Sequence, residues 1–251
     1  MVGGVKKFEE HFRGFQDRYV LIGGTACDLV CSEQGLDFGR VTKDFDLVLC
    51  VEALDDGFVR LIWDFIRQGQ YEIKQKSGSR CLYRFAKPRS AGFPSMLELF
   101  SRRLDAVDVA DGAACTPVPA GAEDSSLSAI LLEEESYRFL MTSTAVIRGV
   151  HVATAECLIP LKARAWMDLR KRKEAGEKVD SKNIAKHRND IYRLSRLLPE
   201  SLRMSVPPAM KESLQSWDEA GSSDPLQEDH PALGGVESVR IHALLKGVYQ
   251  L

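Results

Sequence analysis

The sequence lacks paired-cysteine motifs, long apolar runs and any large net charge, and each absence excludes a class of protein. The six cysteines stand apart, without CxxC pairs or neighbouring histidines, so the spacing of a zinc site is missing. No apolar run is long enough to cross a bilayer, and the chain opens with the polar stretch MVGGVKKFEE rather than a signal peptide. We therefore expect a cytoplasmic protein with reduced, mostly buried thiols and no membrane partner.

Charge is balanced over the whole chain but concentrated in one part of it. The formal net charge is −2 over 251 residues, which excludes a polycation built for nucleic acid. From Pro160 to Arg196, however, twelve lysines and arginines stand against five acids, a local charge of +7. Any attraction for nucleic acid or for an acidic partner is therefore expected in this stretch.

Hydrophobic patterning predicts an α+β protein with two domains. Short apolar strands are predicted over 19–23, 44–52, 71–75, 81–87 and 94–103, with a strand-then-helix segment over 128–141 and a hairpin over 145–155. Helices are predicted over 25–35, 55–70, 157–175, 181–198, 207–221 and 236–251. We expect a mixed β-sheet with flanking helices over residues 1–155 and a helical domain over 156–251.

The first candidate site feature is a glycine pair between a strand and a helix. Gly23 and Gly24 end the apolar run YVLI, and a short helical pattern follows them. Glycine allows close approach of a ligand, and the N–H groups at a helix N-terminus bind phosphate well. An ordinary strand-to-helix turn would use the same residues, so the glycine pair alone is weak evidence.

Two aspartates in the next strand strengthen the case. Asp44 and Asp46 are two residues apart in DFDLVL, so their side chains project from the same face of a strand. Adjacent carboxylates repel unless a cation neutralises them, and Mg²⁺ commonly uses one or two carboxylates together with substrate phosphates. The alternative is that the strand begins at Phe45 and that both acids lie at a solvated end.

Glu98 is the single charge in the apolar stretch MLELF. A buried carboxylate is costly unless it is paired or bound to a metal, so Glu98 is a candidate third ligand beside the two aspartates. A half-exposed strand with Glu98 facing solvent is the alternative.

The order of these features resembles the nucleotidyltransferase superfamily related to DNA polymerase beta. Strand, glycine pair, helix and D-x-D strand follow one another, and LKARAWMDL and KHRNDIYRL resemble the helical motifs of AbiEii/AbiGii-like nucleotidyltransferases. The resemblance covers roughly residues 15–200. It implies transfer of a nucleoside monophosphate from a nucleoside triphosphate to a hydroxyl on RNA or protein, with Mg²⁺ or Mn²⁺. Many relatives are toxins of toxin–antitoxin or phage-defence systems, so tRNA-like RNA and a cognate antitoxin are implied partners.

The resemblance also assigns roles to individual residues. It implies that Asp44, Asp46 and, from the superfamily pattern, Glu98 bind the metal. The residues assigned to the triphosphate or its loop are Gly23, Gly24, Thr25, Arg40, Thr42 and Lys162. Asp190 is assigned to orienting Lys162 or assisting the acceptor hydroxyl.

Simpler readings of the same residues stay open. Lys162 could belong to a solvated helix face, and His187 could be a surface histidine. Asp190 could form an intrahelical pair with Lys186 or Arg193. At the level of function, the alternatives are an inactive nucleotidyltransferase fold that senses nucleotide or binds a protein, and a metal-dependent phosphohydrolase. The histidine clusters usual in such hydrolases are missing from the sequence.

Overall fold

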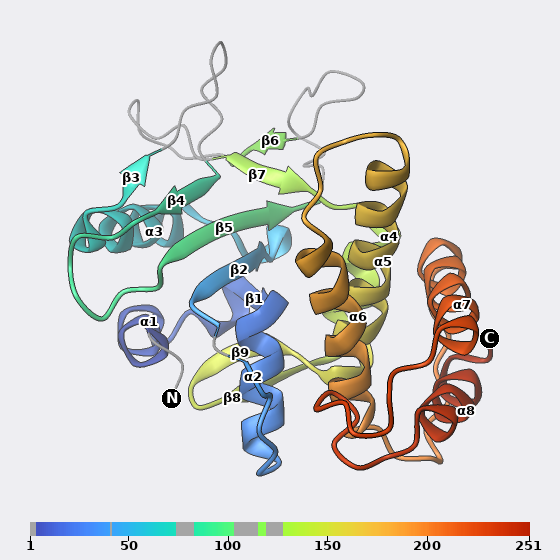
Figure 1. Ribbon diagram of the computed structural model, residues 1–251. Coiled ribbons are helices and arrows are strands. Elements are labelled where there is room, and N and C mark those ends of the chain that lie inside the picture. The colour runs from blue at the N-terminus through green and yellow to red at the C-terminus, as the bar shows by residue number, and fades with distance from the viewer. Residues whose placement is uncertain (1–3, 41, 74–82, 103–114, 119–127) are drawn as a thin grey trace. The chain divides into compact units, whose positions relative to one another are not determined.

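The chain folds as two compact units in the computed structural model, which describes residues 4–40, 42–73, 83–102, 115–118 and 128–251 (Figure 1). The sheet unit comprises Met1–Leu29 and Val41–Ala153, and the helical unit comprises Val30–Arg40 and Thr154–Leu251. The segment 30–40 therefore belongs to the helical unit although sheet-unit residues precede and follow it. No local sequence signal marks this assignment.

A mixed sheet organises the sheet unit. The nine strands among the described residues are β1 Tyr19–Ile22, β2 Asp44–Leu49, β3 Glu72–Ile73, β4 Arg84–Ala86, β5 Met96–Ser101, β6 Cys115–Pro117, β7 Ser128–Leu131, β8 Thr144–Ile147 and β9 Val150–Ala153. Their order is β3-β4-β5-β2-β1-β9-β8, with β7 paired to the end of β5 and β6 paired to β7. β1 is antiparallel to β2, whereas β2 and β5 are parallel. The predicted α+β fold, a mixed sheet with flanking helices followed by a C-terminal set of helices, is confirmed.

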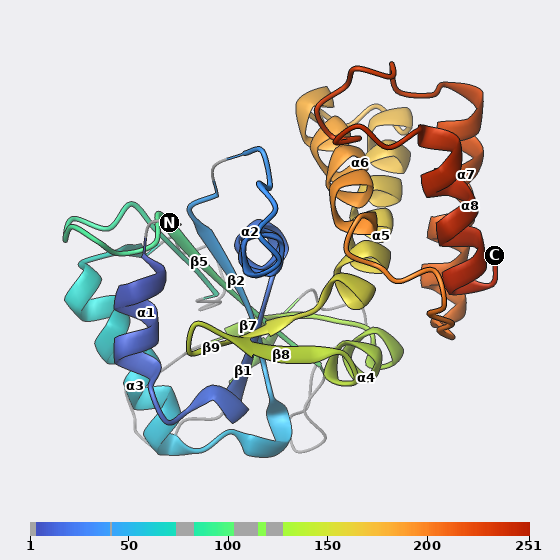
Figure 2. The ribbon, with the colours of Figure 1, turned by 90° about the horizontal axis from the view of Figure 1, so that it is seen from below.

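Aromatic side chains hold two helices against one face of this sheet. α1 (Val5–Phe12) and α3 (Asp56–Gly69) lie on the same side of the sheet (Figure 2). The Phe8 ring lies 5.2 Å from the rings of Tyr19 on β1 and Phe45 on β2, and 5.7 Å from that of Phe65 on α3. Edge-on and tilted aromatic pairs each stabilise by about 0.5–1.5 kcal/mol beyond the apolar area they bury. This packing fixes which face of β2 points toward α1 and α3.

The alternation along β2 then places its acids on the other face. Phe45, Leu47 and Leu49 are buried on the face toward α1 and α3, and Asp44, Asp46 and the buried Val48 alternate with them on the opposite face. α2 (Gly23–Glu33) lies on the side of the sheet opposite α1 and α3 (Figure 2). The two aspartates and the start of α2 therefore share one face of the sheet.

Four helices form most of the helical unit: α5 Ala155–Glu174, α6 Ser181–Ser195, α7 Pro208–Ser223 and α8 Ser238–Tyr249. α5 starts two residues earlier than predicted, which puts Pro160 beyond its first turn. Proline has no N–H to offer the carbonyl four residues before it, here that of Glu156. The Tyr249 hydroxyl donates to this carbonyl oxygen over 2.9 Å, so a residue of α8 satisfies it.

Several other expectations have clear outcomes. α6 begins at Ser181 as predicted, and Asp180 caps it by accepting from the Lys182 N–H over 2.9 Å. The polar N-terminus was not expected to form a helix, yet it contains α1, whose Phe8 and Phe12 are buried. β6 lies in a stretch for which the sequence predicts no regular element, and the segment between the predicted strands over 71–75 and 81–87 lies outside the described residues.

The chemistry of the cysteines also follows the prediction where the structure describes them. Cys27, Cys31, Cys50 and Cys157 are unbridged and buried. Burial raises the pKa of the Cys50 thiol to about 12, with a further increase from the nearby charge of Glu52. Across the described ranges, no helix combines the length and hydropathy needed to cross a membrane.

α4 (Glu134–Met141) completes the sheet unit by tying its loops together. The Tyr137 hydroxyl donates to Glu52 over 2.7 Å and accepts the Val51 N–H over 2.9 Å. This bridge anchors the short 3₁₀ turn that follows β2.

Candidate active site

The glycine that opens α2 is required by its surroundings. Gly23 follows β1 directly and has φ 73°, in the left-handed region that disfavours side chains. A Cβ built at this position would overlap the carboxylate of Asp46. Two independent reasons therefore require glycine at this position: the positive φ angle, and the Asp46 carboxylate that occupies the space of a Cβ atom. The result is a carboxylate set against the first turn of a helix whose N–H groups, including that of Gly24, have no partner within the helix.

Asp44 and Asp46 lie side by side on β2, as the sequence predicts. Asp44 is exposed and Asp46 is partly buried. In the sheet, Asp46 stands opposite Ile22 of β1 and beside Glu98 of β5, and Asp44 stands beside Met96. The prediction that both acids belong to the strand is confirmed, because β2 begins at Asp44.

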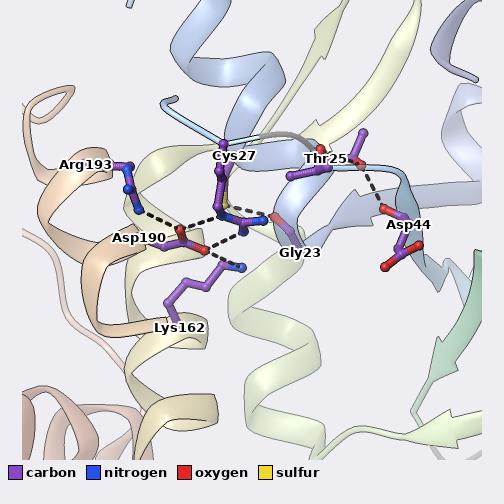
Figure 3. A network of polar contacts seen from close by, with 9 residues as sticks. Gly23, Thr25, Cys27, Asp44, Lys162, Asp190 and Arg193 are labelled. Carbon is purple, nitrogen blue, oxygen red and sulfur yellow. Dashed lines mark hydrogen bonds and ion pairs between the residues drawn. The ribbon is translucent and has the colours of Figure 1, made fainter. Parts of the chain in front are cut away.

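Two buried threonines anchor this aspartate strand to α2. The Thr25 hydroxyl donates to the backbone carbonyl of Asp44 over 2.7 Å and lies 3.2 Å from the Thr42 hydroxyl (Figure 3). Thr25 is fully buried and Thr42 is 7% exposed. The structure thus gives both residues a positioning contact, and their predicted contact with phosphate stays a prediction.

Glu98 has a partner that the sequence did not reveal. It is buried, and its Oε1 accepts from Arg84 Nε over 2.6 Å and lies 2.5 Å from Arg84 Nη2. Glu98 lies on β5 between two neighbouring strands. It pairs in register with Arg84 of β4 on one side and with Asp46 of β2 on the other. The guanidinium neutralises Glu98 where a metal ion was expected to do so. Its role as a ligand stays a prediction.

The donor set suits a hard divalent cation that takes part of its coordination from substrate. Within the part of the chain that the structure describes, no three histidine, cysteine, aspartate or glutamate side chains are grouped to hold a metal by themselves. Asp44 and Asp46 supply carboxylate oxygens, and Mg²⁺ typically completes two such ligands with water and phosphate oxygens. The pair therefore fits Mg²⁺ or Mn²⁺ bound together with a triphosphate.

A second charged cluster lies within the helical unit, around Asp190 on α6. Asp190 is fully buried and lies 3.2 Å from the ammonium of Lys162 on α5 (Figure 3). Arg40 donates two hydrogen bonds to the Asp190 carboxylate, from Nε over 2.9 Å and from Nη2 over 2.7 Å. Arg193 lies 3.3 Å away on the same helix. Three cations thus contact one carboxylate, and the cluster keeps a surplus of positive charge.

Electrostatics keep Asp190 ionised and His187 neutral. Burial opposes ionisation of Asp190, but the hydrogen bond from Arg40 and the charge of Lys162 outweigh it and hold the pKa of Asp190 below its usual value. Burial and then the charge of Lys162 lower the pKa of His187 to about 3. Its Nδ1 is buried without a partner among the described residues. The His187 side chain as a whole is half-buried, so its ring is neither fully exposed nor part of the core.

The structure assembles the predicted residues in two groups. Gly23, Thr25, Thr42, Asp44 and Asp46 come together in the sheet unit. Arg40, Lys162 and Asp190 come together in the helical unit, where the Arg193 pair that was one simple reading of Asp190 is also present. Lys162 is buried rather than on a solvated face. Sequence reasoning missed the Arg40–Asp190 and Arg84–Glu98 pairs, because nothing local marks contacts between residues 150 and 14 positions apart.

Comparisons with known proteins find similarity among solved structures. No protein-family model and no curated protein matches this chain. Solved structures similar to it include JHP933 from Helicobacter pylori, at 15% identity and a TM-score of 0.47, covering 96% of this chain and 90% of that one. Another is an antigenic nucleotidyltransferase-like protein from Paracoccidioides brasiliensis, at 16% identity and a TM-score of 0.41, covering 86% and 84%. Because both TM-scores lie below 0.5, the function proposed below rests on the geometry of the aspartate strand.

Proposed function

We propose that this protein is a metal-dependent nucleotidyltransferase. It would transfer a nucleoside monophosphate from a nucleoside triphosphate to a hydroxyl on RNA or protein and release pyrophosphate. The observation that carries the proposal is the contact between Gly23 and Asp46, which sets a carboxylate pair against the N-terminus of α2. A bound Mg²⁺ or Mn²⁺ would neutralise charge on the phosphates.

In this proposal, different groups of the sheet unit bind the metal and the phosphates of the triphosphate. Asp44 and Asp46 bind the metal through carboxylate oxygens, and the N–H groups of the first turn of α2 donate to phosphate oxygens. Thr25 holds the backbone of Asp44 in place. Catalysis of this kind depends on positioning and charge neutralisation and needs no protein nucleophile.

The helical-unit residues form the finer part of the proposal. The motif resemblance assigns Lys162 to the triphosphate and Asp190 to orienting Lys162. The 3.2 Å contact between their charged groups supports the second assignment. The surplus of cations around Asp190 supports the first, because a buried cluster with excess positive charge is stabilised by an anion.

The proposal of RNA as the acceptor rests on the positive charge at the end of α5. The end of α5 and the turn after it, residues 171–178, are exposed and rich in lysine and arginine, which favours an RNA backbone. A role as the toxin of a toxin–antitoxin pair is the most specific form of the proposal. Growth arrest on expression in bacteria, absent for the aspartate variant described next, tests that form.

The proposal is tested by label transfer. The protein is incubated with Mg²⁺, each α-labelled nucleoside triphosphate in turn, and total RNA or cell extract, beside an Asp44→Asn/Asp46→Asn variant. Asp17→Asn/Asp64→Asn is the matched control, since it removes two exposed carboxylates, 69% and 52% accessible, from the same unit. We expect label on RNA or protein with the wild type and the control, and none with the aspartate variant.

Three other outcomes count against the proposal. Nucleotide binding without transfer would support a sensing or protein-binding module, for which the Arg84–Glu98 pair is the favourable observation, since it removes one carboxylate from the face. Release of inorganic phosphate without an acceptor would support a phosphohydrolase. Absence of both binding and transfer would refute a nucleotide-dependent function.

A further inference from the structure

The helical unit contains a pocket that the proposed transfer reaction does not use. Its volume is about 630 Å³, within the range of small-molecule sites. It is lined by the end of α5, the first half of α6, the end of α7 and the segment that follows α7 up to His230. These elements all belong to the helical unit, so the pocket is complete within one compact unit.

The charge of the pocket favours an anionic ligand. Arg170, Lys173 and Arg188 line it together with two carboxylates, Glu174 and Asp224. Arg170 pairs with Glu174 over 3.3 Å, and Arg188 binds the side chain and the backbone carbonyl of Asp224. Lys173 instead donates to the Ser181 hydroxyl over 2.6 Å, and among the described residues no carboxylate contacts its ammonium. One positive charge is therefore left for a ligand.

Other walls suit a flat, partly apolar group with hydrogen-bonding edges. The Arg170 guanidinium lies 4.8 Å from the centroid of the Trp166 ring, which holds this planar group in one orientation. Nucleic-acid bases stack on arginine planes held in this way. Ile184 and Leu226 supply apolar surface, and the Asn189 amide carries a donor and an acceptor, the combination that reads the edge of a base.

His230 adds a directed donor. Its Nδ1 accepts the backbone N–H of Ala232 over 3.1 Å, so the neutral ring carries its proton at Nε2. A donor in a pocket that Lys173 and Arg188 also line suits a phosphate or carboxylate oxygen. A carboxylate alone would leave the Arg170 plane and the apolar walls unused.

We infer that this pocket binds a nucleotide unit, an aromatic base that carries a phosphate, supplied either as a free nucleotide or as an unpaired nucleotide of RNA. The base stacks on the Arg170 plane, and the phosphate is bound by Lys173 with Arg188 and His230. The two sources share this chemistry and differ in chain length, so one experiment separates them.

The experiment measures binding to the full-length protein in EDTA, where metal-dependent binding at Asp44 and Asp46 is removed. The probes are AMP and a single-stranded hexaribonucleotide, titrated by calorimetry and mapped by hydrogen exchange. Arg170→Ala/Lys173→Ala removes two of the three pocket cations and leaves Arg188 in place. Lys171→Ala/Arg172→Ala is the matched control, because it removes the same charges from the same helix at exposed positions outside the pocket.

Binding of AMP, weakened at least about tenfold by the pocket variant and less than about twofold by the control, would support the free-nucleotide source. The same pattern for the hexaribonucleotide alone would support the RNA source. In either case, slower exchange is expected in peptides covering residues 166–189 and 220–231. Equal losses in the two variants would reduce the effect to diffuse electrostatic attraction and would overturn the inference, as would absence of binding by both probes. Because EDTA is present, these outcomes do not depend on the proposed transfer activity.

Discussion

Replacing Gly23 by alanine tests the packing that brings Asp46 to the start of α2. At φ 73° the substitution costs about 1–2 kcal/mol in backbone energy. The new Cβ also overlaps the Asp46 carboxylate, and forcing an extra methyl group into an occupied space typically costs a further 1–3 kcal/mol or so. We expect Gly23→Ala to lower the free energy of unfolding by about 2–5 kcal/mol and to displace Asp46.

A matched glycine separates the two contributions. Gly92, in the same unit, has φ 82°, and a Cβ built there meets nothing within 4 Å. Gly92→Ala should therefore show the backbone cost alone, about 1–2 kcal/mol. Urea unfolding of both variants measures the difference, and label transfer shows whether Asp46 still functions. Equal losses of stability in the two variants, with full activity in Gly23→Ala, would refute the close approach of Gly23 and Asp46.

Three further predictions concern buried polar groups. Asp190→Asn leaves three cations around a neutral side chain and should lower the free energy of unfolding by about 3–5 kcal/mol. Asp168→Asn, at an exposed position, should lower it by at most about 1 kcal/mol. Equal effects in urea unfolding would contradict the stabilising contacts of Asp190 with the three cations. His187, with its pKa near 3 when folded and about 6.5 when unfolded, favours folding above pH 6.5 and loses that contribution as pH falls. The free energy of unfolding should fall between pH 6.5 and pH 5 by up to about 2 kcal/mol more in the wild type than in His187→Gln. The same fall in both proteins would refute a neutral His187 in the folded state. Thr25→Val should lower stability by about 1–2 kcal/mol and Thr25→Ser by less, because serine keeps the hydroxyl that donates to Asp44; the reverse order in thermal denaturation would exclude that hydrogen bond.

The pH dependence of Asp190 has the same sign over a lower range. Its folded pKa lies below the unfolded value of about 3.9, so its stabilisation is present above pH 4 and is lost as pH falls further. The window from pH 6.5 to 5 therefore separates the contribution of His187 from that of Asp190.

Local sequence features predicted the elements of the aspartate strand well. An apolar run, a glycine pair and an alternating D-x-D strand each act over a few residues, and β1, α2 and β2 follow them closely. α1 escaped prediction because its eight residues are mostly charged or polar, and its burial depends on Phe8 and Phe12 meeting rings from β1, β2 and α3. Its stability is tertiary, and a short polar helix carries little local signal.

The charged partners were harder to predict for a different reason. Arg84 and Glu98 meet because β4 and β5 pair in one particular register, which the hydrophobic pattern does not specify. Arg40 reaches Asp190 because the segment 30–40 packs with helices that begin more than a hundred residues later. The motif resemblance singled out Lys162 and Asp190 and predicted that Asp190 orients Lys162. The folded chain shows the contact between them and adds the contact with Arg40, to which no sequence pattern pointed.

The central claim, that Asp44 and Asp46 bind a metal with a nucleoside triphosphate, is tested most directly by calorimetric titration of each triphosphate in the presence and absence of Mg²⁺. The account predicts Mg²⁺-dependent binding to the wild type and to Asp17→Asn/Asp64→Asn, and a loss of at least about tenfold in affinity for Asp44→Asn/Asp46→Asn. Mg²⁺-dependent binding of unchanged affinity in the Asp44→Asn/Asp46→Asn variant would contradict it.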